Sequence, residues 1–531
     1  MRGEVGPLPT IEEAAARLRG RQVSSVELVT AAIARADALD GRLGSYLTRF
    51  DDAALTAAKQ ADADFAAGID RGPLQGIPVA VKDNILSQEG PTTGQSVVRN
   101  PAWDRPGDAS CVARLRQAGA VLTGKLALSE FAIGTPDLDA PFPRPRNPWD
   151  LGCWPGGSSS GTAVAVAAGL VCAGLGSDTA GSIRIPSAFC GLTGLKPTVG
   201  RVPVAGSIPL AISLDAIGPM ARSAWDCAAL LQVIAGQDAA DPLSLATPVP
   251  DYVADLGRNL DGLRVGVLDQ DLVGPGDDTA RCYAGALDVL RELGGQLIPA
   301  ALPEFDRTIA AAMVIIGAEA FAFHQADLQR HWQDYSRSTR QRIGAGAFAT
   351  GAQVLRAQGQ RALAQRELDT LFDDVDLLVH PTTAMTAPRF GPNEELDHGA
   401  IHAAMRSARY WNCTGAPSLV LPMGLAADGL PLSLQVAARH GNESLLLAVG
   451  SAFQARTDWH RQVAPLTDSV PVDPAGGAGA PARPAEADVR AAREILRRAG
   501  VDPGPDAEAM GGAYAAAQVE LAVIDGSAGL G

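Results

Sequence analysis

Residue types that mark disulfide-bonded, zinc-binding or nucleic-acid-binding proteins are scarce in this chain of 531 residues. Its seven cysteines form no CxxC pair, which argues against a disulfide framework and a metal site and predicts a reduced, cytoplasmic setting. Lysine and arginine number 44 against 59 acidic residues, and the net charge of −15 comes without any basic block. We therefore expect no nucleic-acid partner and no membrane partner. Apolar residues still make up 47%, which excludes global disorder.

Long hydrophobic stretches are also missing. Residues 1–10 lack the apolar core of a secretory signal. The longest uncharged apolar run, residues 162–176, is shorter than the roughly 20 residues that a membrane span needs. We interpret this run, which is rich in Ala and Gly, as a buried helix.

The chain alternates between helix and strand patterns. Ser24 followed by Glu27 is the capping box that opens a helix. Short apolar runs at 77–82 and 120–125 indicate strands, and residues 262–300 show a strand–helix–strand pattern. This alternation predicts an α/β fold.

The composition changes near residue 470. Residues 470–486 are rich in Pro, Gly and Ala, which is typical of a linker, and residues 487–531 carry apolar positions at helical spacing. We therefore divide the chain into a body (1–469), a linker (470–486) and a small C-terminal helical hairpin (487–531). The apolar face of the hairpin must pack on the body, on a second copy or on a partner. We favour a homodimer contact, because two-fold pairing is the commonest oligomeric arrangement.

Two familiar motifs are present only in part. Residues 119–125 match the first seven positions of a phosphate-binding P-loop, but Leu126 stands where a hydroxyl should ligate Mg²⁺. Residues 157–161 match the nucleophile elbow of α/β-hydrolases, with Ser159 at the centre. The residues before them cannot form the strand that an elbow requires. The elbow stays an alternative.

Two Ser/Gly clusters remain, at residues 156–161 and 178–184. Tight Gly-rich turns expose backbone N–H groups that can stabilise an oxyanion, although ordinary turn chemistry gives the same composition. A serine nucleophile needs a base, and no histidine lies in a conspicuous motif. Lysine occurs at four positions, and Lys82 ends a buried strand, where burial would lower its pKa toward a useful range.

These segments resemble the amidase signature family, over roughly residues 9–463. The resemblance implies an α/β fold with a single large mixed β-sheet covered by helices. It rests on GIPVAVKDNI (76–85), NPWDLG (147–152), GGSSSGTAVAVAAGLV (156–171), GSDTAGSIRIPSAFCGLTGLKPTVGRVP (176–203), SLDAIGPMARS (213–223), HPTTAMTAP (380–388) and CTGAPSLVLPMGLAADGLPLSLQ (413–435).

The resemblance further implies a Ser-cisSer-Lys triad that hydrolyses amides without a cofactor or metal. Ser182 would be the nucleophile, Ser158 the bridging serine and Lys82 the base. The oxyanion hole would consist of the backbone N–H groups of Thr179, Ala180, Gly181 and Ser182, and the loop would be supported by Gly157, Asp178 and Arg184.

Two departures from the family pattern bear on the substrate. Ala180 stands where a second glycine is common, and GGSSSG replaces the more frequent GGSSGG. Alanine disfavours positive φ, so the first change would re-aim the loop. Both variants resemble family subsets that act on urea-type or small amides. We therefore expect a small-molecule carboxamide or urea-type substrate, cleaved through an acyl-enzyme on Ser182.

The main alternative is the glutaminase (A) subunit of a tRNA-dependent amidotransferase. Those subunits typically continue the Ser-Ile-Arg motif with Gln-Pro, whereas this chain has Ile185-Pro186. A catalytically dead scaffold is a third possibility, against which the complete triad argues. The substrate pocket is expected in residues 134–152, 201–216 and parts of 306–350, and no basic anchor for a substrate carboxylate stands out.

Overall fold

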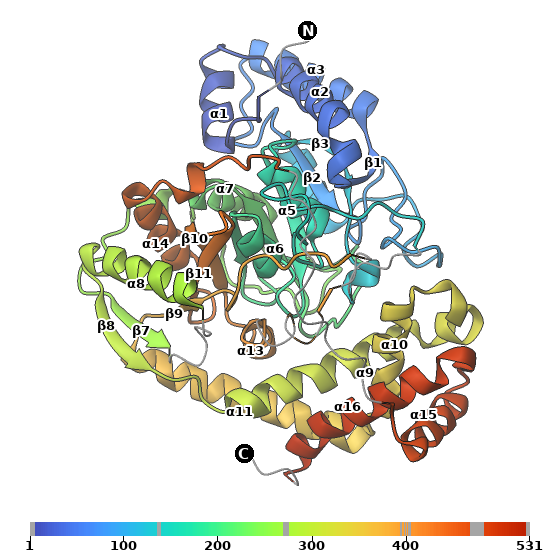
Figure 1. Ribbon diagram of the computed structural model, residues 1–531. Coiled ribbons are helices and arrows are strands. Elements are labelled where there is room, and N and C mark those ends of the chain that lie inside the picture. The colour runs from blue at the N-terminus through green and yellow to red at the C-terminus, as the bar shows by residue number, and fades with distance from the viewer. Residues whose placement is uncertain are drawn as a thin grey trace.

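The computed structural model describes residues 6–134, 140–268, 276–392, 396–397, 399, 401, 405–467 and 483–526. Four pairs of neighbouring strands are parallel, namely β2–β3, β2–β4, β7–β8 and β7–β9. All other neighbouring strands are antiparallel. Within the described residues one mixed sheet of 11 strands has the order β1-β3-β2-β4-β6-β5-β10-β11-β9-β7-β8 (Figure 1). The single large mixed sheet predicted from the sequence is confirmed. The strands are β1 (Tyr46–Arg49), β2 (Pro78–Lys82), β3 (Val121–Leu126), β4 (Ala173–Asp178), β5 (Thr193–Lys196), β6 (Ala216–Ala221), β7 (Arg264–Leu268), β8 (Gln296–Ala300), β9 (Leu377–Pro381), β10 (Ser418–Leu425) and β11 (Pro431–Ala438).

Helices surround this sheet. The N-terminal helices lie at one end of the molecule, and the long helices α9 and α11 lie at the other (Figure 1). The capping box at Ser24 is formed, since its side chain accepts the Glu27 N–H and the Glu27 carboxylate accepts the Ser24 N–H. The helices are α1 (Ile11–Arg19), α2 (Ser25–Leu43), α3 (Asp51–Ala66), α4 (Ser110–Gln117), α5 (Ser160–Ala167), α6 (Arg184–Phe189), α7 (Ala224–Ile234), α8 (Asp277–Glu292), α9 (Phe305–His331), α10 (Arg337–Ala345), α11 (Gly351–Asp374), α13 (Ala408–Thr414), α14 (Glu443–Arg456), α15 (Glu486–Arg498) and α16 (Ala507–Asp525).

The apolar run 162–176 is not one helix, so that expectation is wrong. Helix α5 ends at Ala167, Gly169 adopts a φ of 66°, and the chain then enters strand β4. Both elements are buried on all sides. A buried helix and a buried central strand share the same apolar composition, so composition could not separate them.

The helix with the length and composition of a membrane span is Phe305–Asp334, which includes α9. Half of its apolar window is buried inside the protein, where α9 packs against α11, α13 and α16. The same length and composition suit a core helix of a large domain.

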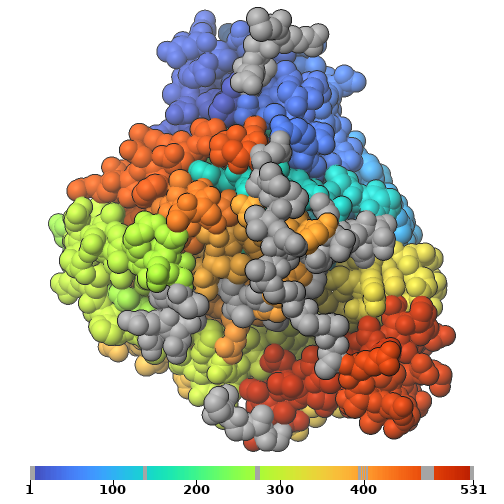
Figure 2. All heavy atoms as spheres, in the orientation of Figure 1, coloured from blue at the N-terminus to red at the C-terminus, as the bar shows by residue number. Residues whose placement is uncertain are grey.

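The C-terminal helices α15 and α16 pack on each other and on the body, beside α9 and α10 (Figures 1 and 2). Met510 and Leu521 of α16 are buried in the main core, and Asp506 accepts hydrogen bonds from Trp332 and Arg340. The apolar face is therefore covered by the body of the same chain. Of the expected linker, residues 470–482 lie outside the described residues, and α15 begins at Glu486.

Candidate active site

Lys82, the last residue of β2, is fully buried beside two serines. Its Nζ lies 2.7 Å from Ser158 Oγ and 2.9 Å from Ser177 Oγ, and it also donates to the Ser177 carbonyl at 3.3 Å. Burial lowers the pKa of Lys82 to about 7, although the charges of Asp178 and Asp215 oppose the shift. The amine can therefore be neutral near neutral pH, as a base must be. Ser177 is a neighbour that the sequence did not single out.

The other two buried lysines of the body are engaged elsewhere. Lys125, the lysine of the partial P-loop, contacts Thr92 Oγ1 at 2.7 Å and pairs with Asp83 at 2.9 Å inside strand β3. Lys196 donates to the Pro197 carbonyl at 3.1 Å. The phosphate-binding interpretation is thereby excluded, because the lysine is neither exposed nor free.

Ser158 and Ser159 have different surroundings. The peptide bond between Gly157 and Ser158 is cis, and Ser158 lines a cavity that also contains Ser182. Ser159 is fully buried and donates its hydroxyl to the Ser177 carbonyl at 3.2 Å. The residues that precede it form no strand. The nucleophile-elbow alternative therefore lacks its geometry.

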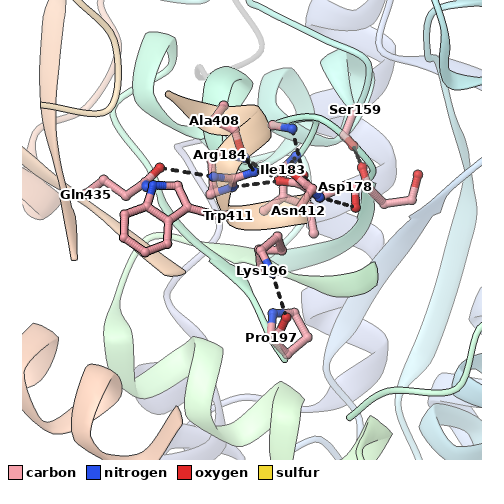
Figure 3. Close-up of polar contacts among 12 residues, drawn as sticks. Ser159, Asp178, Ile183, Arg184, Lys196, Pro197, Ala408, Trp411, Asn412 and Gln435 are labelled. Atoms are coloured by element: carbon pink, nitrogen blue, oxygen red, sulfur yellow. Dashed lines mark hydrogen bonds and ion pairs between the residues drawn. The ribbon is translucent and has the colours of Figure 1, made fainter. Parts of the chain in front are cut away.

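The second Ser/Gly cluster is the loop between β4 and α6, and Asp178 organises it (Figure 3). The Asp178 carboxylate accepts hydrogen bonds from the N–H groups of Gly181 at 2.7 Å and Ile183 at 3.1 Å, and Arg184 Nε lies 3.0 Å away. Asn412 donates to the same carboxylate at 2.9 Å from helix α13. Burial alone would raise the pKa of Asp178, but the Arg184 charge and these hydrogen bonds hold it well below its usual range.

Glycine is required at position 181, both for the backbone conformation and because a Cβ would clash with its neighbours. The φ of Gly181 is 115°, and a Cβ there would lie 2.6 Å from Ile185 and 2.7 Å from Ala408. Ala180 does not have a positive φ, so alanine is compatible with the loop as it stands and the expected re-aiming is not required.

The backbone donors of the loop are not all available. The Gly181 N–H is held by Asp178, whereas within the described residues those of Thr179, Ala180 and Ser182 have no acceptor. Ser182 itself is partly exposed and lines the cavity with Ser158. The Ser159 N–H donates to the Ser182 carbonyl at 3.2 Å, which joins the two Ser/Gly clusters. A serine thus stands beside unengaged N–H donors and near a serine–lysine pair.

The cavity at Ser182 has a volume of about 560 Å³. Its lining includes residues from the segments expected to form the pocket, among them Gly134, Leu210 and Met313. It also includes segments that the sequence did not indicate. From before and within α13 these are Ile401, Met405 and Arg409, and from the C-terminal helix α16 they are Ala509, Ala513, Ala516, Ala517, Glu520 and Leu521. In the described part of the chain no group of three or more His, Cys, Asp or Glu side chains is placed to hold a metal ion.

The family model for amidases matches residues 27–447, and the chain belongs to this family, as the resemblance of its motifs implied. It is an amidase-family hydrolase of carbon–nitrogen bonds. The family model ends before helices α15 and α16.

Individual proteins within the family are also similar to this chain. The chain is 40% identical to the (A) subunit of the glutamyl-tRNA(Gln) amidotransferase of Roseiflexus, over 86% of this chain and 98% of the relative. It is 39% identical to the protein of the same name from Methylococcus capsulatus, over 85% of this chain and 97% of the relative. The peptide amidase of Stenotrophomonas maltophilia has a similar structure, with a TM-score of 0.73 at 33% identity over 84% of this chain and 96% of that one.

These relatives overturn the expectations about partners. We expected a small-molecule substrate and no nucleic-acid partner, yet the relatives are named as one subunit of an enzyme that is itself named for a tRNA. The homodimer stays a prediction, because the names of the relatives do not bear on it. The acidic net charge did not justify excluding a nucleic-acid partner, because one subunit of an assembly need not carry the surface that binds the nucleic acid.

Proposed function

We propose that the protein hydrolyses an amide C–N bond through an acyl-enzyme on Ser182. The observation that carries this proposal is the 2.7 Å contact between Lys82 Nζ and Ser158 Oγ, in a site where burial lowers the pKa of Lys82 to about 7. A lysine with the ordinary pKa of ~10.4 holds its proton at neutral pH and cannot act as a base.

In the first step, neutral Lys82 accepts the proton of Ser158, and Ser158 accepts the proton of Ser182. The Ser182 Oγ attacks the amide carbonyl, and the resulting oxyanion accepts hydrogen bonds from the unengaged N–H groups of the loop. The proton then returns through Ser158 to the leaving nitrogen, and the C–N bond breaks to leave an ester on Ser182. Water attacks this ester through the same relay, releases the acid and restores Ser182.

Mass spectrometry of enzyme quenched during turnover tests this assignment. We expect the mass of the acyl group on the peptide that contains Ser182, and no adduct in Ser182→Ala. Ser159→Ala is the matched control, because Ser159 is buried away from the cavity. An adduct on Ser159 would restore the elbow interpretation and overturn the proposal.

The names of the relatives favour one particular amide substrate, glutamine. We propose that the chain releases ammonia from the carboxamide of glutamine, as the glutaminase subunit of an amidotransferase acting on glutamyl-tRNA(Gln). Reconstitution with partner subunits encoded in the same genome, plus the charged tRNA, tests this. Glutamine turnover should depend on the assembly, and a preparation with no glutamine turnover under any condition contradicts it.

A second candidate, an amidase for amides with an apolar body, is favoured by the cavity lining. Ile185 stands where the amidotransferase subunits typically carry Gln, and it lines the cavity together with Trp154 and Met405. A panel of aryl amides, aliphatic amides, urea derivatives and esters, compared with glutamine by product release, separates the two candidates. A kcat/KM for an apolar amide well above that for glutamine selects the second.

A further inference from the structure

A histidine that no motif singled out lies behind the loop between β4 and α6. His380 is fully buried in strand β9 and is paired across the sheet with Gln435 of β11. Neither side chain is among the described residues that line the cavity at Ser182. Arg184, at the start of α6, nevertheless donates a hydrogen bond of 3.3 Å to Gln435 Oε1. The imidazole is therefore connected to the loop that carries Ser182 without touching the cavity.

The protonation state of this imidazole follows from neighbours whose hydrogen-bonding roles are fixed. The Pro381 carbonyl can only accept and lies 2.7 Å from His380 Nδ1, so Nδ1 carries a proton. The Trp411 indole can only donate and lies 3.0 Å from His380 Nε2, so Nε2 must accept. His380 is therefore neutral, with its proton on Nδ1. Burial lowers the pKa of His380 to about 4, the Pro381 carbonyl opposes this shift, and the charge of Arg184 adds to it.

The neutral imidazole in turn fixes the amide group of Gln435. Because a guanidinium only donates, the amide oxygen must face Arg184. The amide nitrogen then lies 3.0 Å from His380 Nε2 and donates to it. With a proton on Nε2, two N–H groups would face each other, and the amide could satisfy only one of its two neighbours. The orientation in which Gln435 accepts from Arg184 thus depends on the histidine acceptor.

Two arms run from this acceptor to the same carboxylate. The first arm passes through Gln435 to Arg184, whose Nε lies 3.0 Å from the Asp178 carboxylate. The second passes through Trp411 of α13, since the next residue, Asn412, donates to that carboxylate at 2.9 Å and to the Asp178 carbonyl at 3.0 Å (Figure 3). Asp178 accepts the N–H groups of the residues on either side of the nucleophile. Both arms therefore end on the group that shapes the loop.

We propose that His380 is a positioning residue for the proposed acyl transfer, because its Nε2 holds Trp411 and Gln435 and, through them, the loop that carries Ser182. A buried network with every member paired favours one geometry. A misplacement of about 1 Å at a reacting group can lower the rate on the order of 10²-fold. Since His380 lies outside the cavity lining, its loss should lower kcat and leave KM unchanged. The inference rests on acyl transfer at Ser182, and it holds for any amide that the cavity admits.

Two polar substitutions separate the acceptor role from packing. In His380→Gln the side-chain oxygen can take the place of Nε2, whereas the shorter side chain of His380→Asn ends before it. With glutamine and with acetyl-4-nitroanilide, we expect kcat within about threefold of the wild type for His380→Gln. For His380→Asn we expect a kcat about ten- to hundredfold lower and a KM within about twofold. Equal losses of kcat in the two variants, or no loss in His380→Asn, overturn the inference.

The matched control is Tyr283→Phe. Tyr283 donates a hydrogen bond of 3.0 Å to the carbonyl of Val379, the neighbour of His380 on the same strand. Tyr283→Phe thus removes a buried hydrogen bond to β9 outside the two arms, and kcat should stay within about twofold. Denaturant unfolding of all variants records their stability beside the rates. A fall in kcat that follows stability alone, Tyr283→Phe included, contradicts a positioning role.

Labelling with fluorophosphonate–biotin gives a readout that does not depend on the choice of amide. The Ser182 Oγ forms a bond to phosphorus, fluoride leaves, and the serine proton passes through Ser158 to Lys82. The labelling rate, read by mass spectrometry, should fall in His380→Asn by the same order as kcat. Gln435→Leu removes the first arm and leaves the histidine in place, so it should also slow labelling, and it serves if a His380 variant does not fold. The double variant should be no slower than the slower single variant, and additive losses contradict a shared network.

Nitrogen NMR of the histidine side chains separates this inference from the proposed function. At neutral pH, the signals that His380→Gln removes should belong to a neutral imidazole with its proton on Nδ1. A proton on Nε2 overturns the inference. A wild-type protein with the expected imidazole that hydrolyses no amide and takes up no fluorophosphonate refutes acyl transfer at Ser182. A wild-type protein that does both, with His380→Asn equally fast, refutes the positioning role alone.

Discussion

The two sides of the cavity are built in opposite ways. On the side of the loop between β4 and α6 the central carboxylate is fully paired, since Asp178 accepts hydrogen bonds from Gly181, Ile183, Arg184 and Asn412. On the side formed by α10, α13 and α16 the surface is mostly apolar, and two arginines have no partner in the described residues. The hydrogen bonds to Asp178 hold the loop in one geometry, which the proposed acyl transfer requires. Unpaired cations in an apolar wall are free to meet a ligand, which selection of a substrate requires.

The largest effect should come from the catalytic side. Ser182→Ala should lower kcat by a factor on the order of 10⁴ or more, because a methyl group cannot form the acyl-enzyme. Lys82→Ala should be nearly as damaging, and the double variant should be no worse than the single variants, because the residues act as one unit. Steady-state kinetics check this. Additive losses would make Lys82 a structural residue only.

The pairing on the same side predicts a large effect on stability. Asp178→Asn leaves the buried Arg184 charge without its counter-ion, so the free energy of unfolding should fall by about 3–5 kcal/mol. The control is Asp70→Asn, which removes the exposed partner of Arg19 and should cost about 0–1 kcal/mol. Denaturant unfolding measures both, and equal costs would contradict the network.

Substitutions on the side formed by α10, α13 and α16 should change which substrates are accepted and should leave the chemical step unaffected. Ala513→Phe on α16 fills part of the cavity, so kcat/KM for bulky amides should fall by about tenfold or more while small amides are spared. Ala515→Phe, on the same helix and outside the lining, is the matched control. A uniform loss for all substrates would mean that α16 supports the fold only.

The lysine also predicts how the activity depends on pH. Because burial lowers the pKa of Lys82 to about 7, kcat/KM should rise about tenfold per pH unit below pH 7 and level off above it. The shift favours the neutral amine, so activity is lost as the pH falls. A limb near pH 7 that persists in the residual rate of Lys82→Ala would belong to another group, of which Asp215, with a pKa raised by burial to about 6, is one.

The catalytic side was far easier to predict from the sequence. Short contiguous motifs contain Lys82, Ser158 and Ser182, so each residue could be identified without knowing the fold. Strand β2 was recognised by its apolar run. Strand β4, which leads into the nucleophile loop, was missed because it continues the apolar composition of α5. Asn412 was missed because it lies 234 residues from Asp178, and a single hydrogen-bond donor leaves no local pattern.

The motifs in the sequence identify the family and the residues of the two Ser/Gly clusters, because each motif is short and contiguous. The resemblance to that family, and not the periodicity of the segments, implied the mixed sheet. Which N–H groups of the loop are unengaged, how α16 closes the cavity and where Arg342 and Arg409 meet depend on the folded structure. Those features join segments far apart in the chain, and burial gives a side chain its pKa and its lack of partners only after the segments have packed. Neither the pKa of a side chain nor its lack of partners can be predicted from a pattern along the sequence.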